Sequence, residues 1–419
     1  MNFTFNAYYT LIAAVIVLLI GKFLVNKIEF LRKYNIPEPV AGGLVAATIS
    51  TLVYNFWGYS ITTSSELQTS FMLIFFISIG LSANFAKLKE GGKSLFIFLL
   101  VVSGFIIIQN FVGISLATAL GIEPLIGLIA GSITLTGGHG TAGAWGSILE
   151  TKYGIEGAMG LGMAAATFGL VMGGIIGGPL AKFLINRYKL SNEKELQQNN
   201  SKDEKVIDEF VPFEYPKAVR LITTNSAIST LALFAACLAF ADFITNLTKG
   251  SAFELPTFVW ALAGGVILRN SLENILKIEI FDRAIDVFGN ASLSLYLAMA
   301  LLSLKLWQLS NLAGALTVIL ISQVLIMILY AYFVTFRVMG KNYDASVLAA
   351  GHCGFGLGAT PTAVANMQAI TNMYGPSHRA FLIVPLCGAF FVDLINTTVI
   401  QTMSPLHNHL ILIISIFRL

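Results

Sequence analysis

The sequence predicts an all-α polytopic membrane protein with about ten transmembrane helices, arranged as two inverted-topology repeats of five. First, 56% of the 419 residues are hydrophobic and only 11% are charged, whereas about 25% of the residues in soluble domains are charged. Second, the apolar residues form long uncharged runs that do not alternate with polar residues, as they would in a β-barrel. Third, one polar stretch divides the runs into two sets of five, and an odd number per set makes the second half start from the opposite side of the membrane.

The runs mark the apolar centres of helices, each of which needs roughly 20 residues to span the hydrocarbon. They lie at residues 11–21, 40–58, 67–86, 94–121 and 160–181, and then at 221–247, 258–268, 287–304, 312–336 and 381–403. The stretch 186–220 is rich in Lys, Glu, Asp, Gln and Asn, a composition that cannot bury a core. We therefore expect a first repeat over 1–185, a cytoplasmic linker over 186–220 and a second repeat over 221–419.

The distribution of basic residues predicts the orientation of the chain. If the N-terminus is outside, all but four of the 25 Lys and Arg residues face the cytoplasm, the exceptions being Lys152, Lys249, Lys305 and Arg418. This bias is a strong positive-inside signal, and it predicts that both termini are periplasmic. No basic stretch precedes the first apolar run, so we expect that run to be a retained helix and not a signal peptide.

One segment in each half combines apolar context with glycine and small polar residues. These are GSITLTGGHGTAGAWG at 131–146 and GHCGFGLGATPTAVAN at 351–366. Irregular backbone at membrane depth is tolerated only where it is buried in protein or lines a wet cavity. We therefore predict re-entrant hairpins at about 125–148 and 345–371, whose unwound tips offer N–H groups to anions and carbonyl groups to cations. The alternative is that the small residues only let helices pack closely.

Several polar side chains stand out against apolar surroundings. Asp393 is flanked by apolar residues, and Asn396 and Thr397 follow three and four residues later, on the same helix face. Their oxygens suit Na⁺, although they equally suit a helix–helix hydrogen bond. The histidines His139 and His352 could bind a carboxylate, carry a proton or bond to a freed carbonyl.

For three further polar residues in apolar runs, we expect a structural role. Asn84, Gln109 and Asn110 lie within apolar runs. Such side chains either line a transport pathway or form interhelical hydrogen bonds, and the second role is the more common.

The sequence lacks the motifs of the common enzyme classes. EGGKS at 90–94 resembles a phosphate-binding loop, but Lys87 occupies the position where that loop needs a glycine. There is no HExxH, no GxSxG and no paired intramembrane Asp motif. The three cysteines form no CxxC pair and have no metal-ligand spacing. A secondary transporter or a channel remains, and the two matched hairpin segments favour the transporter.

Long strings of this sequence resemble the bacterial sodium/glutamate symporter family over essentially the whole chain. They include IPEPVAGG at 36–43, AGSITLTGGHGTAGAW at 130–145, FELPTF at 253–258, SLSLYLAMALLSLKLW at 292–307, MGKNYDASVLAAGHCGFGLGATPTAVANMQAIT at 339–371, GPSHRAFLIVP from 375 and AFFVDLIN from 389. The resemblance implies Na⁺-driven uptake of L-glutamate across the bacterial inner membrane, with Na⁺ as the coupling ion. It further implies a homodimer in which a transport part moves elevator-fashion against a scaffold part. It suggests no organic cofactor and no nucleic-acid partner.

The resemblance and the residues together predict where the ligands bind. Neither hairpin has a deep Arg, so we expect the carboxylates of glutamate to be held by backbone N–H groups and hydroxyls at the tips, at Gly138, His139, Gly140, Thr141, Gly358, Thr360, Thr362 and Asn366. The expected Na⁺ ligands are Asp393, Asn396, Ser132 and Thr134. The alternatives are another small dicarboxylate, H⁺ coupling through His139 or His352, an ion channel, or a membrane scaffold without transport.

Overall fold

The computed structural model describes residues 2–33, 36–190, 222–250, 255–278, 280–302 and 312–404, and these residues are mostly helical. The first half contains β1 (Asn2–Thr4), α1 (Ala7–Lys27), α2 (Glu29–Lys33), α3 (Glu38–Trp57), β2 (Ser60–Thr62), α4 (Ser65–Ser82), α5 (Phe85–Ala119), α6 (Pro124–Leu128), the π-helical turn η1 (Ile129–Ile133), α7 (Gly138–Tyr153) and α8 (Ala158–Tyr188). Most of the predicted linker, 191–220, lies outside the described residues.

The second half contains α10 (Thr224–Thr248), α11 (Thr257–Asn270), η2 (Ser271–Ile275), α12 (Asp282–Leu302), α13 (Ala313–Tyr330), η5 (Ala331–Thr335), α14 (Phe336–Val338), α15 (Tyr343–Leu357), α16 (Thr360–Tyr374), α17 (His378–Leu386), η6 (Cys387–Phe391) and α18 (Val392–Met403). Both halves follow one order: three separate helices, a longer helix, a pair of helices around a break, and a last helix. The two inverted repeats of five crossings stay a prediction.

Eight helices of the described chain are long and apolar enough to cross a membrane. The other two predicted crossings, 258–268 and 381–403, fall in interrupted helices. The first lies within α11, which passes into the π-helical turn η2. The second is divided among α17, η6 and α18, with Pro385 inside α17. Proline removes a backbone donor and crowds the preceding turn, which explains why no single helix covers this run.

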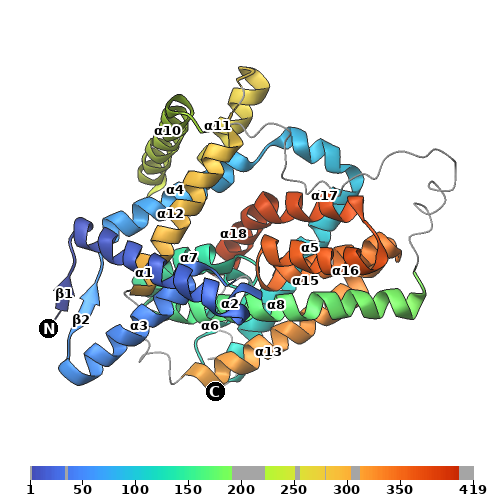
Figure 1. The fold of residues 1–419 in the computed structure, drawn as a ribbon, viewed down its shortest axis with the longest axis horizontal. Coiled ribbons are helices and arrows are strands. Elements are labelled where there is room, and N and C mark those ends of the chain that lie inside the picture. The colour runs from blue at the N-terminus through green and yellow to red at the C-terminus, as the bar shows by residue number, and fades with distance from the viewer. Residues whose placement is uncertain are drawn as a thin grey trace.

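The helices pack in two groups, and in Figure 1 α4, α10 and α11 of one group lie at the left while α15, α16 and α17 of the other lie at the right. The outer group contains α1, α3, α4, α10, α11 and α12. The inner group contains α5 to α8 and α13 to α18. Within the outer group α4 and α11 cross very closely: a Cβ on Gly80 would lie 2.2 Å from the carbonyl oxygen of Leu262, so only glycine permits this approach.

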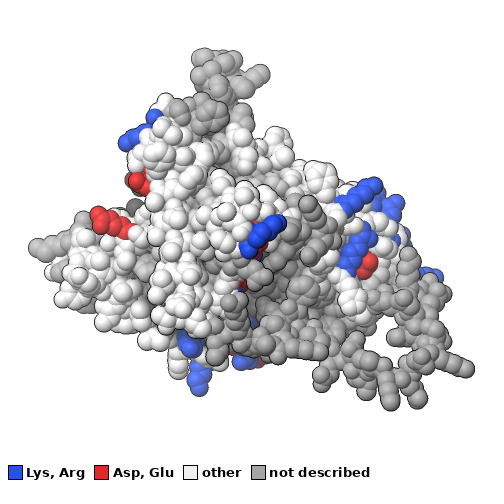
Figure 2. All heavy atoms as spheres, turned by 90° about the horizontal axis from the view of Figure 1, so that it is seen from above, with Lys and Arg blue, Asp and Glu red and all other residues white. Residues whose placement is uncertain are grey.

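The surface agrees with a protein that faces lipid. Lys, Arg, Asp and Glu side chains cover only small, separate parts of the face in Figure 2. Large apolar side chains are exposed along α1, α10 and α13, as Leu19, Phe23, Leu231 and Leu325 exemplify. Exposed apolar surface on this scale marks a membrane-embedded face. The chain is therefore a multi-pass membrane protein.

Candidate functional site

The two broken segments depart from helical geometry at glycines. In the first, Gly131 has φ −101° and ψ −135°, and Gly138 starts α7 in the left-handed region with φ +65°. In the second, α15 ends before Gly358 (φ −143°, ψ −98°), and an extended Ala359 leads into α16. Each segment therefore has a helix, a short break and a second helix, with bounds of 124–153 and 343–374.

The two breaks meet inside the inner group. A Cβ on Gly138 would lie 3.5 Å from the carbonyl oxygen of Gly358, so the predicted tips of the two halves are in contact. The neighbouring carbonyl of Leu357 lies against Gly169 of α8. Two breaks that lie more than 200 residues apart in the sequence are therefore in contact in the structure.

The first break is completed by two asparagines from other helices. The Ser132 N–H donates to Oδ1 of Asn110 on α5 at 2.8 Å, and Nδ2 of Asn396 on α18 donates to the Ser132 carbonyl at 2.9 Å. These bonds replace the helical partners that the backbone loses at Gly131. They also fix the orientation of both amides, because the N–H needs an acceptor and the carbonyl needs a donor.

Three polar atoms around Ser132 are buried and make no protein hydrogen bond: Ser132 Oγ, Asn396 Oδ1 and Asn110 Nδ2. A buried polar group without a partner costs roughly 1–3 kcal/mol. The two oxygens are hard ligands of the kind that alkali and alkaline-earth cations bind. The hydrogen bond between them brings the predicted Na⁺ ligands Ser132 and Asn396 together, and their role as cation ligands stays a prediction.

The other two predicted Na⁺ ligands have different surroundings. The Thr134 hydroxyl is buried and donates to the Ile129 carbonyl at 2.6 Å, which leaves its oxygen lone pairs as acceptors. Asp393 is half-buried on α18, one turn before Asn396. No contact described here joins Asp393 or Thr134 to Ser132, so their part in the site stays a prediction.

At the first tip, His139 has a structural partner. Its Nε2 lies 3.0 Å from Thr167 Oγ1, and that hydroxyl donates to the Met163 carbonyl at 2.8 Å. The Thr167 proton is therefore used, so His139 donates through Nε2. Thr141 is buried, and a Cβ on Gly140 would lie 2.5 Å from the Phe75 ring of α4.

At the second tip, the predicted residues differ in whether their side chains already have hydrogen-bond partners. Thr362 is buried, and its Oγ1 has no hydrogen-bond partner. Thr360 is half-buried and lies beside Gly388 of η6. Asn366 instead uses its amide hydrogens on the carbonyls of Gly173 and Ala350, at 2.8 and 3.3 Å. Thr362 is therefore available to a ligand, whereas Asn366 joins α16 to α8 and α15.

His352 lies away from the break, inside an aromatic cluster. Its Nδ1 is 2.8 Å from Thr335 Oγ1 of η5. The rings of Phe98, Phe105, Tyr330 and Phe355 surround it, with centroids 5.3–6.0 Å from the imidazole. Its Nε2 is buried without a hydrogen-bond partner, so the predicted roles of His352, binding a carboxylate, carrying a proton or bonding to a carbonyl, stay predictions.

Sequence reasoning did not assign a site role to Gln109, Thr136 or Gln323. The structure places Thr136 in the first break and Gln109 between the two breaks, where Gln109 bonds to Thr136 and to the Gly356 carbonyl. Gln323 bonds to the backbone carbonyl of Gln109. The adjacent polar residues Gln109 and Asn110 in one apolar run were the available signal, and the interhelical hydrogen bonds expected of them are present.

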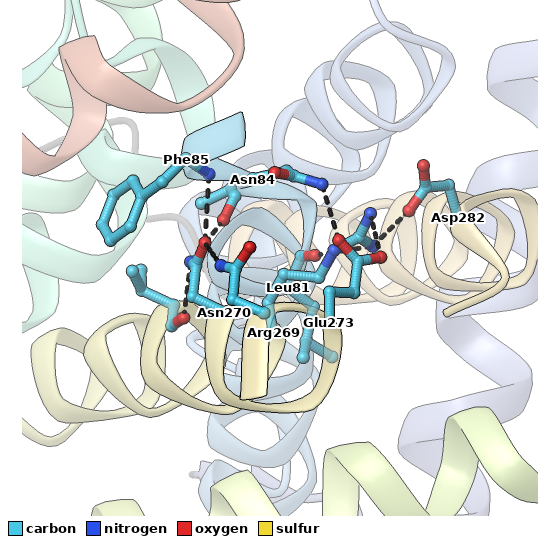
Figure 3. A network of polar contacts seen from close by, with 10 residues as sticks. Leu81, Asn84, Phe85, Arg269, Asn270, Glu273 and Asp282 are labelled. Atoms are coloured by element: carbon cyan, nitrogen blue, oxygen red, sulfur yellow. Dashed lines mark hydrogen bonds and ion pairs between the residues drawn. The ribbon is translucent and has the colours of Figure 1, made fainter. Parts of the chain in front are cut away.

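A second buried polar cluster ties the ends of α4, α11 and α12 together (Figure 3). Arg269 is almost completely buried; it donates to the Leu81 carbonyl at 3.2 Å, pairs with Glu273 at 2.9 Å and also pairs with Asp282. Asn84 donates to Glu273 at 2.6 Å. The charge of Arg269 is thus compensated by two carboxylates, as burial of a guanidinium requires.

The same cluster holds one of the connections between the two helix groups. Asn270 of α11 accepts from the backbone N–H of Phe85 at 3.0 Å and donates to the Ala83 carbonyl at 2.8 Å (Figure 3). These two bonds fix the short link where α4 of the outer group ends and α5 of the inner group begins. The interhelical hydrogen bonds at the breaks, in contrast, all join helices of the inner group.

Comparison with known proteins gives a consistent result. Residues 3–376 match the sodium/glutamate symporter family. The chain is 51% identical over 401 residues to the sodium/glutamate symporter of Haemophilus influenzae, an alignment that covers 96% of this chain and 98% of that protein. It is also 51% identical over 401 residues to the sodium/glutamate symporter of Escherichia coli, covering 95% and 97%. These relatives are symporters and not enzymes, and the chain belongs to the sodium/glutamate symporter family.

Proposed function

We propose that this chain is a secondary active transporter that takes up L-glutamate with Na⁺ across the inner membrane. Membership of the sodium/glutamate symporter family supports the substrate and the coupling ion. The structural observation that carries the proposal is the contact between Ser132 and Asn396, whose free oxygens lie at a break in the first half.

Glutamate binds where the two breaks meet. The N–H groups at the start of α7, from His139 onward, and the hydroxyls of Thr141, Thr360 and Thr362 are donors that suit carboxylates. Gly138 and Gly358, whose N–H groups already donate to the carbonyls of Thr134 and Gly354, let the backbone approach the substrate closely. The unpartnered Thr362 hydroxyl supports this assignment most directly. Asn366 contributes by positioning α16 against α8 and not by holding the substrate.

Sodium binds next to the first break. Ser132 Oγ and Asn396 Oδ1 are the first ligands; Thr134, just after η1, and Asp393, on α18 with Asn396, are further candidates. Glutamate carries a net charge of −1, so its entry against an inside-negative potential costs about 2.3 kcal/mol per 100 mV. Co-transport of two or more Na⁺ makes the moving charge positive, and the potential then drives uptake.

The two helix groups move relative to each other in an elevator-type mechanism. The outer group is the scaffold, and the inner group with both breaks is the transport part. Glycines of α7 form part of the contact between them: Gly140 lies against Phe75 of α4, and Gly143 against Tyr296 of α12. Trp145 of α7 also packs against Phe258 of α11, with ring centroids 5.8 Å apart, and this contact has to change when the groups move. The hydrogen-bonded link at Phe85 and Asn270 then acts as the fixed point.

Ten crossings in two inverted repeats, each with a re-entrant hairpin, account for the order of elements. The predicted orientation, with both termini periplasmic, puts the first hairpin's ends outside and the second's inside. It also puts β1 on the same side as the connection that contains β2, and these two strands pair in parallel. The family resemblance supports a homodimer.

Uptake by purified protein in proteoliposomes tests the function. Radiolabelled L-glutamate is offered with an inward gradient of Na⁺, of K⁺ or of H⁺. Accumulation above the external concentration with Na⁺ alone supports the symporter. Uptake with H⁺ but not Na⁺ replaces it by a proton-coupled transporter, and competition by other small dicarboxylates tests the substrate. Flux without accumulation indicates a channel.

A further inference from the structure

Gln109 lies between the two breaks and bonds to both through one side-chain amide. Its Oε1 accepts from Thr136 Oγ1, in the first break, at 2.7 Å. Its Nε2 donates to the carbonyl of Gly356, at the end of α15, at 3.1 Å. Thr136 Oγ1 is itself 3.2 Å from the Gly356 carbonyl. We call these three residues the tip bridge.

A second glutamine holds the tip bridge in place from the other half. Nε2 of Gln323 on α13 donates to the backbone carbonyl of Gln109 at 2.7 Å. Both glutamines and Thr136 are buried. The backbone of α5 at Gln109 is therefore bonded to α13, while the Gln109 side chain bonds to the two breaks.

The chemistry of the tip bridge is specific to an amide. Gln109 uses one acceptor and one donor, pointing to different segments, and only a primary amide supplies both at the same chain length. A glutamate would lack the donor for Gly356, and a leucine would lack both. Neither tip can shift relative to the other without breaking one of these buried bonds.

We propose that Gln109 is a positioning residue, which keeps the two breaks at the separation that glutamate needs. This inference rests on the proposed function, because it takes the meeting point of the breaks as the substrate site. Gln109 touches backbone and Thr136 and contributes no group to the ligand itself. Its loss should therefore change affinity more than the maximal rate, since small misplacements of binding groups are expensive.

The experiment compares Gln109→Leu, Thr136→Val and Thr136→Ser with the unchanged protein in detergent and in proteoliposomes. Backbone hydrogen exchange is measured over 132–140 and 354–362, and glutamate uptake gives KM and the maximal rate. Ser103→Ala is the matched control, because Ser103 is on the same helix and its hydroxyl bonds only to the Leu99 carbonyl of that helix at 2.7 Å. Thr136→Ser keeps the hydroxyl and should therefore keep the tip bridge intact.

Exchange should rise in both segments together in Gln109→Leu and in Thr136→Val, while KM for glutamate rises about tenfold or more. Thr136→Ser and Ser103→Ala should match the unchanged protein. Unchanged exchange at the tips, or an unchanged KM in a folded Thr136→Val, overturns the proposal. If the unchanged protein takes up no glutamate, the function fails separately, and the exchange data still decide whether the tip bridge couples the two breaks.

Discussion

Asn396 on the last described helix donates its Nδ2 to the backbone carbonyl of Ser132 across 2.9 Å, and so closes a break that belongs to the other half of the chain. The remaining Asn396 Oδ1 and the Ser132 hydroxyl are buried without partners. This arrangement separates two roles, because the Ser132 backbone holds the fold while its hydroxyl is free for the ion.

Ser132→Ala should weaken Na⁺ binding without disturbing the break. The variant keeps the N–H and carbonyl that Asn110 and Asn396 hold, and it removes only the free hydroxyl. We expect the Na⁺ concentration for half-maximal uptake to rise roughly 10- to 100-fold. Na⁺-dependent thermal stabilisation in detergent measures the same loss independently of transport. Ser322→Ala, which removes a hydroxyl bonded to its own helix, is the control.

Thr362→Val should weaken glutamate binding in a protein that still folds. Valine has nearly the shape of threonine, and the lost hydroxyl has no protein partner. A hydrogen bond to a charged group contributes roughly 1.5–3 kcal/mol, so KM for glutamate should rise about ten- to hundredfold. Thr371→Val on the same helix is the control, since the Thr371 hydroxyl bonds to the Gln368 carbonyl. Equal KM values in the two variants would remove Thr362 from the site.

Arg269→Ala should destabilise the outer group and the link to α5. The substitution leaves Glu273 and Asp282 without their buried cation. Breaking a fully buried pair costs roughly 3–5 kcal/mol, and the cost here should be smaller because the Asp282 side chain is 44% exposed. The melting temperature in detergent should fall clearly, and exchange should rise near Ala83 and Phe85. Arg283→Ala is the control, because Arg283 is exposed on α12 and surface changes stay within about 0.5 kcal/mol. Equal melting temperatures for the two variants would show that the cluster does not secure this link.

The helical, multi-pass character and the positions of the breaks were predictable because hydrophobic runs and glycine clusters are local signals. The broken segments occur at 124–153 and 343–374, close to the re-entrant hairpins predicted at 125–148 and 345–371, and that these segments are re-entrant stays a prediction. The partners of the breaks were not predictable. Asn110 and Gln109 are 22 and 27 residues from the groups they bind in the first break, and Gly356 is 247 residues from Gln109. Hydrogen bonds between residues so far apart in the sequence depend on how the helices pack. The periodicity of the sequence does not indicate which helices pack together.

The same distinction applies to individual site residues. Asn396 and Ser132 were chosen separately, as oxygen donors in apolar context, and their contact emerges only from the packing of α18 on η1. Asn366 was chosen by the same reasoning, yet its amide serves the Gly173 and Ala350 carbonyls. Residue type and apolar context therefore identify polar groups at the breaks, while the division between ligand and support depends on which backbone groups remain unsatisfied.

Gly138→Ala compared with Gly154→Ala separates backbone strain from function. Both glycines have left-handed φ, +65° and +69°, where an L-residue costs about 1–2 kcal/mol. A Cβ at 154 meets only open space, whereas a Cβ at 138 points at the Gly358 carbonyl, 3.5 Å away, and fills the place where the breaks meet. The two variants should therefore lose similar thermal stability, but only Gly138→Ala should lose glutamate uptake. Equal uptake in both variants would mean that substrate does not approach the tip at Gly138, and the meeting point of the breaks would then be a packing contact and not a binding site.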